Sequence, residues 1–158
     1  MVVDDLARVL EWRNHPAIRT SMLSQAKIDP DEHRRWFERC LETGSRQLLI
    51  FELDGEPKGF VSFNSPDISG VSEWGFYRAP HAPRGTGGKL AAAAIQYGFG
   101  GLNLHKICGR TLGGNERSIR FHRKLGFHQE GVLRQQHFDG ERYHDIVCFG
   151  LLRTEWTR

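Results

Sequence analysis

The stretch that decides the fold is Arg84-Gly-Thr-Gly-Gly-Lys89, which follows Glu73-Trp-Gly-Phe-Tyr77 and precedes an alanine-rich run from Leu90 to Phe99. The first flank has the composition of a strand and the second that of a helix. Closely spaced glycines let successive backbone N–H groups converge, and the start of a helix adds partial positive charge. We therefore predict a loop that can hold a diphosphate, reinforced by Arg84 and Lys89. An ordinary glycine-rich connector is the alternative interpretation.

Two other kinds of phosphate-binding loop fail on spacing. A nucleotide-triphosphate loop needs a glycine where this chain has Pro83, and a serine or threonine where it has Leu90. A dinucleotide fingerprint also needs a glycine at the position of Leu90. The glycine-rich stretch therefore belongs to neither class.

Upstream of this stretch the periodicity is first helical and then extended. Apolar residues recur at helical spacing from Leu6 up to a break at His15-Pro16. A second helix is predicted between a cap at Asp29 and an end at Gly44. Its predicted buried stripe is Trp36, Phe37, Cys40 and Leu41.

The remaining elements are predicted from alternation and turn residues. The turn Asp54-Gly55-Glu56-Pro57 joins two extended runs into a hairpin, 47–53 and 58–64. Downstream we expect a strand over 106–111, a helix over 116–125, and a last strand pair turning at Asp139-Gly140. This order predicts one α/β (α+β) domain over residues 1–158, with a mixed, mostly antiparallel central sheet covered by helices.

Charge and residue spacing exclude several classes of function. The 22 cationic and 19 anionic side chains leave a net charge of +3, far below the excess expected of a nucleic-acid binder. No apolar window approaches a membrane span, so we expect a cytoplasmic protein without a membrane partner. The three cysteines include no C-x-x-C pair and the eight histidines no H-E-x-x-H pair, so we expect no metal.

A second motif lies in Asn115-Glu-Arg-Ser118-Ile-Arg-Phe121-His122-Arg-Lys-Leu125-Gly126-Phe127. Ser118, Phe121 and His122 recur at helical spacing, and Gly126 can end the helix. The order of strand, glycine-rich loop, helix and then Asn-x-x-Ser-x-x-Phe-x-x-x-x-Gly-Phe resembles the acetyl-CoA-dependent N-acetyltransferases of the GNAT superfamily. The two motifs in this order are far more specific than either alone.

Further segments resemble one branch of that superfamily, called PseH. They are Glu11–Pro16, Glu32–Trp36, Leu102–Ile107, Ser118–His122, Glu130–Arg134 and Tyr143–Asp145. The resemblance implies acetylation of the 4-amino group of UDP-4-amino-4,6-dideoxy-N-acetyl-β-L-altrosamine, a nucleotide sugar on the route to pseudaminic acid, which bacteria attach to flagellin. Two other functions stay open: a GNAT enzyme that acetylates a protein N-terminus or another small amine, and a non-catalytic acyl-CoA-binding module.

The resemblance also implies a set of ligand-binding residues. Those for acetyl-CoA are Phe76, Tyr77, Arg78, Arg84, Gly85, Thr86, Gly87, Gly88, Lys89, Asn115 and Ser118. Backbone groups of the first three would pair with the pantetheine arm, and amides of the next six would hold the pyrophosphate. Those for the nucleotide sugar are Arg13, Asn14, His15, His33 and Trp36. Arg13 suits a diphosphate and Trp36 a base, although ordinary helix packing also explains Trp36.

Acetyl transfer to an amine needs a base for the amine proton and an acid for the leaving thiolate. Relatives place a tyrosine as the acid four residues before the glycine of Gly-Phe, where this chain has His122. An imidazole, titrating near roughly 6.5, can serve as that acid, and Tyr143 is the alternative. Glu73 is the predicted base, with Ser62 relaying through a water, although a solvated strand glutamate fits the same pattern.

The start of the chain departs from the family pattern. Relatives have a strand before the Trp-Arg-Asn segment, whereas Met1-Val-Val3 leads almost directly into the first predicted helix. We expect the first strand to be short or missing. The sheet edge left exposed would then be available to a second copy in a homodimer.

Overall fold

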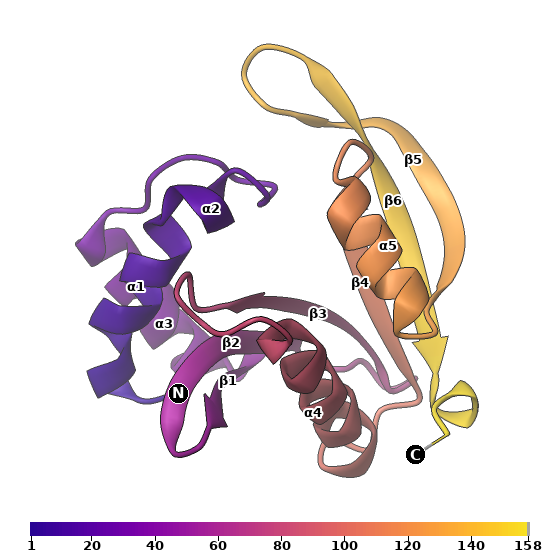
Figure 1. Ribbon diagram of the computed structural model, residues 1–158, viewed down its shortest axis with the longest axis horizontal. Coiled ribbons are helices and arrows are strands. Elements are labelled where there is room, and N and C mark those ends of the chain that lie inside the picture. The colour runs from indigo at the N-terminus through magenta and orange to yellow at the C-terminus, as the bar shows by residue number, and fades with distance from the viewer. Residues whose placement is uncertain (158) are drawn as a thin grey trace.

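A computed structural model describes residues 1–157, and within them six strands form one sheet in the order β1-β2-β3-β4-β6-β5 (Figure 1). The strands are β1 (Arg46–Leu53), β2 (Glu56–Asn64), β3 (Val71–Arg78), β4 (Lys106–Leu112), β5 (His128–Phe138) and β6 (Tyr143–Leu152). The helices are α1 (Leu6–Asn14), α2 (Pro16–Arg19), α3 (Pro30–Thr43), α4 (Thr86–Gly100) and α5 (Glu116–Lys124). Only β3 and β4 pair in parallel, so the predicted fold class is confirmed. Arg158, the last residue of the predicted domain, lies outside the described residues.

Helix α3 begins and ends where its capping residues predict. Asp29 Oδ1 accepts a hydrogen bond at 2.9 Å from the backbone amide two residues on, and Gly44 ends the helix at φ 59°. The predicted buried stripe is wrong at Leu41, which is 62% exposed. His33 is buried in its place because it lies one turn before Phe37, on the face that meets the sheet.

Helix α4 begins earlier than its apolar pattern predicts. It starts at Thr86 rather than Leu90, because Gly85 adopts the left-handed conformation (φ 87°) as N-cap and lets the chain enter the helix at once. Gly87 and Gly88 therefore lie in the first helical turn and not in a loop. The glycine-rich stretch is thus a helix N-terminus, in which the Thr86 amide donates to the Pro83 carbonyl at 3.3 Å and the Gly88 and Lys89 amides donate to the Gly85 carbonyl at 3.1 and 3.4 Å.

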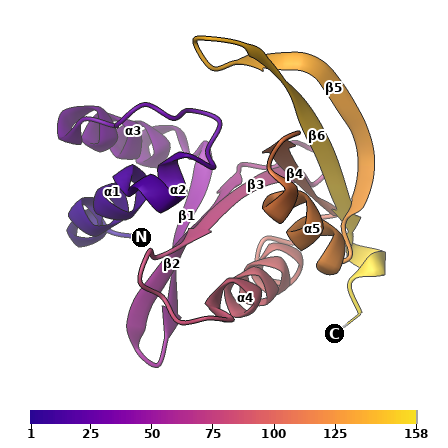
Figure 2. The same ribbon diagram turned by 45° about the horizontal axis from the view of Figure 1, so that its top comes forward.

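The helices cover opposite faces of the sheet (Figures 1 and 2). On one face α4 and α5 close the main core, where Phe63 of β2 packs with Ile95 of α4 and Phe149 of β6. On the other face α1, α2 and α3 cover the β1–β3 side. Because side chains alternate along a strand, Phe60 of β2 points to this second face and meets Trp36 of α3 edge to face, with ring centroids 6.3 Å apart.

β3 and β4 pair over a short length, and this opens the sheet. Residues 71–73 of β3 face residues 106–108 of β4, and no later pair between these two strands occurs within residues 1–157. β2 stays paired with β3 as far as Arg78, and β6 stays paired with β4 as far as Leu112. The two halves of the sheet therefore diverge beyond Glu73.

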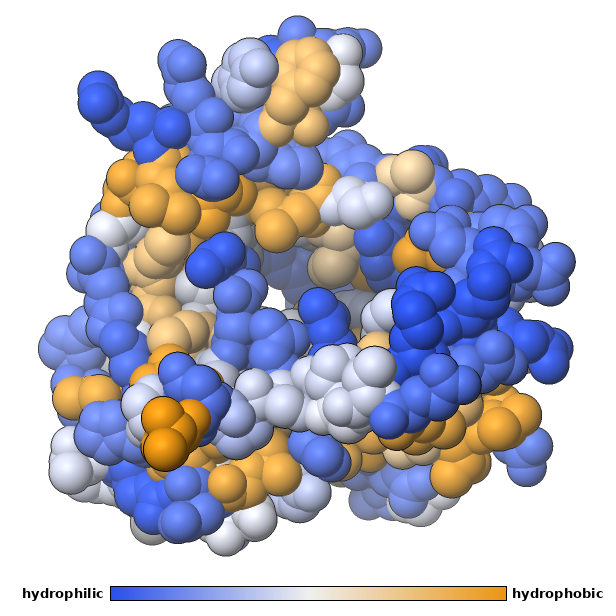
Figure 3. Space-filling view, turned by 180° about the vertical axis from the view of Figure 1, so that it is seen from behind, coloured by the Kyte–Doolittle hydropathy of each residue, from blue (hydrophilic) through white to orange (hydrophobic). Residues whose placement is uncertain are grey.

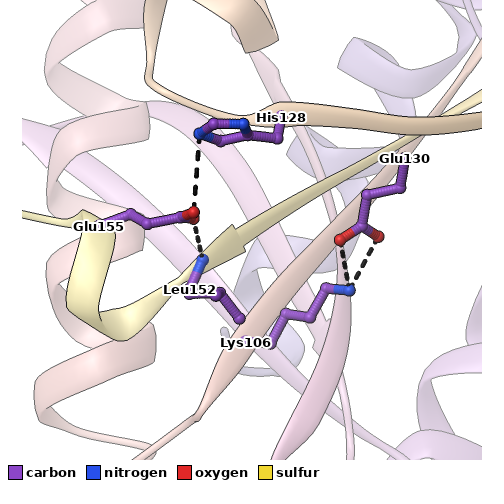
Figure 4. A network of polar contacts seen from close by, with 5 residues as sticks. All are labelled: Lys106, His128, Glu130, Leu152 and Glu155. Atoms are coloured by element: carbon purple, nitrogen blue, oxygen red, sulfur yellow. Dashed lines mark hydrogen bonds and ion pairs between the residues drawn. The ribbon is translucent and has the colours of Figure 1, made fainter.

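Polar contacts fix the closed end of the sheet (Figure 4). Lys106 Nζ of β4 lies 2.6 and 2.8 Å from the two carboxylate oxygens of Glu130 on β5. Glu155 accepts a hydrogen bond from the Leu152 amide at 2.8 Å, and its other oxygen lies 3.6 Å from His128 Nε2. These contacts fasten β4, β5 and β6 to one another within one half of the sheet, and at the same end the pairing of residues 71–73 with 106–108 joins this half to β3.

β1 is an outer strand of the sheet, since no strand precedes α1 in the described part of the chain. The residues before α1 form a 3₁₀ turn, Val3–Asp5, and the Met1 ammonium donates to the Leu48 carbonyl at 3.0 Å. The prediction of a short or missing first strand is confirmed, and the second copy at this edge stays a prediction. Within residues 1–157 no helix has the length and apolar character needed to cross a membrane.

Candidate active site

The diverging strands leave a cleft of about 870 Å³ that passes between the two halves of the sheet. Figure 3, seen from behind, shows the molecule hollowed near its centre. Phe76, Tyr77 and Arg78 of β3 line this cleft, and among residues 1–157 their backbone has no strand partner on the β4 side. The structure thus brings the three residues predicted for the pantetheine arm to an open strand edge.

The first turn of α4 reaches the cleft through one glycine. Gly87 lines the cleft, whereas the other predicted pyrophosphate residues do not: Arg84, Gly85, Thr86, Gly88 and Lys89. A Cβ placed on any of the three glycines would meet nothing within 4 Å, so these positions leave room beside the helix N-terminus. The Thr86 hydroxyl is buried and has no hydrogen-bond partner in the described part of the chain.

Asn115 and Ser118 line the cleft at the start of α5. Asn115 Oδ1 accepts a hydrogen bond from the Ser118 amide at 3.1 Å and so caps the helix. Asn115 Nδ2 lies 3.5 Å from the carbonyl oxygen of Ser21, which follows α2. The asparagine therefore links the two sides of the cleft as well as capping α5.

His122 lies one turn further along α5, almost fully buried between aromatic rings. Its Nδ1 is 2.9 Å from the Ser118 carbonyl oxygen and 3.5 Å from Ser118 Oγ, and its Nε2 is 3.4 Å from Trp74 Nε1. A carbonyl only accepts and an indole N–H only donates, so Nδ1 carries the proton and Nε2 does not. Burial lowers the pKa of His122, an effect partly offset by the Ser118 carbonyl, and this favours the neutral ring.

Glu73 and Ser62 share one face of the sheet and line the cleft together. Glu73 Oε2 lies 3.3 Å from Arg110 Nε across the point where β3 and β4 part. Ser62 pairs with Gly75 across β2 and β3, and a Cβ on that glycine would lie 3.3 Å from Ser62 Oγ. Because Gly75 has no side chain, the buried Ser62 hydroxyl is next to the open strand edge.

The structure places Tyr143, the predicted alternative acid, on an exposed hairpin. It lies at the end of the β5–β6 hairpin, 63% exposed, with its ring 4.9 Å from that of Phe138. Tyr143 does not line the cleft. Near it His144 Nε2 contacts Asp139, but within residues 1–157 no group of three or more His, Cys, Asp or Glu side chains is placed to hold a metal ion.

Arg13 and His33 both have a buried nitrogen without a partner. Arg13 lines the cleft and donates from Nη2 to the Ser24 carbonyl at 2.6 Å, but its Nη1 has no hydrogen bond within the described residues. His33 Nε2 is unpaired in the same part of the chain. Burial lowers the pKa of His33, and the charge of Arg13 lowers it further. Unsatisfied buried polar groups cost free energy, and an anionic ligand would relieve it here.

Of the predicted acceptor residues, Arg13 alone lines the cleft; His33 does not, and Asn14, His15 and Trp36 do not line it either and have structural partners. The Asn14 amide bonds both the N–H and the carbonyl of Ile28 at 2.8 Å. His15 caps α2 by accepting from the Ala17 amide at 3.2 Å. Trp36 stacks on His33 and packs against Phe60, as the packing interpretation of this residue predicts.

The lining of the cleft is strongly cationic, which sequence reasoning missed. Its charged residues within 1–157 are one acid, Glu73, and seven bases: Arg13, Arg46, Arg78, Arg110, Arg117, Arg120 and Lys124. The three bases of α5 stand at helical spacing and could have been found from the sequence. Arg46 and Arg110 come from separate strands that no local pattern brings together.

Comparisons with known proteins give a consistent family. A model described as the acetyltransferase (GNAT) domain matches residues 1–128. The uncharacterized N-acetyltransferase YokL of Bacillus subtilis, derived from the SPbeta prophage, is 31% identical over 127 residues, which is 78% of this chain and 71% of that protein. Acetyltransferase PseH of Campylobacter jejuni is 24% identical over 123 residues, 78% of this chain and 76% of that protein.

The fold is also found in a solved structure. Spermidine N-acetyltransferase from Vibrio cholerae, in complex with CoA and spermine, aligns with a TM-score of 0.88 at 22% identity, over 98% of this chain and 94% of that one. Of these three relatives, only the one from Vibrio cholerae has a name that states its amine, and the comparisons leave the acceptor of this chain open.

The coupling between Arg13 and His33 makes a first prediction. Arg13→Met removes a charge that lowers the pKa of His33, so we expect that pKa to rise towards 6.5. An NMR titration of the imidazole C–H resonances measures it. Arg19→Met is the matched control, because Arg19 also donates to a loop carbonyl, that of Gln25, at 2.7 Å but does not line the cleft. A His33 pKa unmoved by Arg13→Met would mean that the two side chains do not face each other.

Proposed function

The chain belongs to the GNAT acetyltransferase domain family, and on this premise we propose that it acetylates the 4-amino group of a UDP-linked 4-amino-4,6-dideoxy sugar by direct attack on acetyl-CoA in a ternary complex. The acetyl donor follows from the family. The acceptor is our proposal, and it is carried by the unpaired nitrogens of Arg13 and His33.

The cleft fits acetyl-CoA, which supplies an acetyl group activated as a thioester. The open edge of β3 over 76–78 offers backbone groups to the amides of the pantetheine arm. The first turn of α4 offers the positive end of a helix and the space beside Gly87 to a pyrophosphate. Asn115 and Ser118 line the cleft at the start of α5, where we place the sulfur.

A diphosphate on the acceptor would satisfy Arg13 and His33 together. Arg13 Nη1 can donate to a phosphate oxygen, and His33 can do so from Nε2 once that atom carries a proton. Asn14 supports this site indirectly, because it holds Ile28 and with it the loop that carries Ser24, the partner of Arg13.

The same charges argue against a polyamine acceptor. Spermidine, named for one relative, carries several positive charges, and this cleft has seven basic lining residues against one acidic one within the described chain. Like charges in a cleft of reduced dielectric repel, and the repulsion lowers both affinity and association rate. A nucleotide sugar carries the opposite charge and is favoured for the same reason.

We propose that the Ser118 hydroxyl protonates the leaving thiolate and regains its proton from solvent. His122 then has a positioning role, because it holds Ser118. Neutral His122, with its proton on Nδ1, has no proton to give to the cleft, whereas Ser118 Oγ accepts from that N–H at 3.5 Å and keeps its own O–H free. The acid role predicted for His122 stays a prediction that this geometry does not favour. The amine proton is assigned to Glu73, which Arg110 holds at the cleft wall, by way of a water beside Ser62.

The acceptor is tested by turnover with two amines. With acetyl-CoA present, we expect release of free CoA thiol, followed with a thiol reagent, on addition of UDP-4-amino-4,6-dideoxy-N-acetyl-β-L-altrosamine but not of spermidine. Arg13→Met should raise KM for the sugar roughly tenfold or more, the size of a lost charge-assisted hydrogen bond, while Arg19→Met changes it little. Turnover of spermidine alone would refute the acceptor, and CoA binding without turnover of any amine would indicate a binding module.

The donor site makes a separate prediction for Gly87→Ala. The new methyl group has open space in the free protein and a helical position, so the free energy of unfolding should rise by about 0.5–1 kcal/mol. KM for acetyl-CoA should rise, because that space is needed by the pyrophosphate. Gly100→Ala, at the other end of α4 and equally open, should leave KM unchanged. An unchanged KM in Gly87→Ala would place the phosphates elsewhere.

The acid assignment is tested by comparing Ser118→Ala with His122→Asn. General acid catalysis contributes about 10²–10⁴-fold, so Ser118→Ala should lower kcat roughly a hundredfold. Asparagine keeps an N–H donor in place of Nδ1–H, so His122→Asn should keep kcat within about tenfold of wild type, with an unshifted acidic limb of the pH–rate profile. The reverse order of losses would restore His122 as the acid.

A further inference from the structure

The net charge of the whole chain is concentrated on one short helix. α5 contains four cations and one anion, a net of +3, which equals the net charge of all 158 residues. Removing them from the totals of 22 and 19 leaves eighteen side chains of each sign elsewhere. Like charges three or four residues apart destabilise a helix, so this composition calls for an anionic partner.

Three of these cations form a stripe along the cleft. Arg117, Arg120 and Lys124 line the cleft, and we call them the cationic stripe. The opposite side of α5 packs into the core through Ile119. The fourth cation, Arg123, lies off the cleft and donates to Gln129 Oε1 at 2.8 Å. Figure 1 shows α5 beside the gap between β3 and β4.

The partners that the cationic stripe finds within the described chain are weak. Arg120 lies 3.6 Å from Glu116, and both side chains are about 70% exposed, a geometry worth little in water. Arg120 and Lys124 are four residues apart, so their side chains leave α5 close together and can meet one ligand group. Such a pair suits a phosphate monoester, which carries about −1.5 to −2 charges near pH 7.

We infer that Arg120 and Lys124 bind the 3′-phosphate of acetyl-CoA and make the protein select CoA over its 3′-dephospho form. The diphosphate of the donor is assigned to the first turn of α4, and the 3′-phosphate is then the one remaining dianion of the molecule. This inference rests on the acetyl donor of the family and is independent of the acceptor proposed above.

The test is calorimetric titration of the whole protein with CoA and with 3′-dephospho-CoA, without any acceptor. Wild type should bind CoA roughly tenfold to a hundredfold more tightly than dephospho-CoA, as expected for charge-assisted contacts to one phosphate. In Arg120→Ala/Lys124→Ala this ratio should fall to near one, through weaker binding of CoA alone. Lys124→Gln should lower the ratio by a smaller factor, and raised salt should lower it in wild type.

The matched control is Arg123→Ala, which removes an equal charge from the same helix away from the cleft. Its ratio of affinities for CoA and dephospho-CoA should equal that of wild type. This control separates a specific contact from a general electrostatic effect of the helix charge. The inference is overturned if wild type does not discriminate, or if the double variant discriminates as wild type does. A double variant with normal CoA selectivity but a raised KM for the amino sugar would assign the cationic stripe to the acceptor instead.

Discussion

The loss of pairing between β3 and β4 beyond Glu73 is the constraint on which the rest of this structure depends. Unpaired strand edges are costly in a sheet, because their N–H and C=O groups need partners. The sheet sustains this opening because α4 and α5 join both halves in one core, and because residues 71–73 of β3 still pair with 106–108 of β4 at its closed end. The backbone groups so exposed are the ones that an amide-bearing arm can use.

Local sequence signals predicted most of the fold. Asp29, Gly44 and the Asp139-Gly140 turn act within a few residues of themselves, so their effect can be read without the fold. The face of β3 that carries Glu73 could not be read in this way, because alternation gives two faces without saying which one the helices cover. The exposure of Leu41 has the same origin, since the face of α3 is set by its contact with the sheet.

The acceptor side was harder to predict because resemblance supplies residues without their contacts. Arg13, Asn14 and His15 are consecutive, yet Arg13 alone lines the cleft. Asn14 and Arg19 instead bind backbone groups of the segment between α2 and α3, at Ile28 and Gln25. That segment has little regular structure of its own, so these side chains supply the hydrogen bonds that give it a shape. A sequence motif such as Arg13-Asn14-His15 therefore combines a residue that lines the cleft with residues that stabilise the backbone around it.

The two sides of the cleft use charge in different physical ways. Arg13 Nη1 and His33 Nε2 are buried nitrogens, so a ligand that fails to pair with them leaves their desolvation uncompensated, and such a site discriminates against the wrong ligand. The side chains of the cationic stripe are exposed and screened by salt. They therefore attract and orient anions with a smaller desolvation cost than the buried nitrogens have. Under the function proposed above, the buried nitrogens would select the acceptor and the cationic stripe would attract the donor.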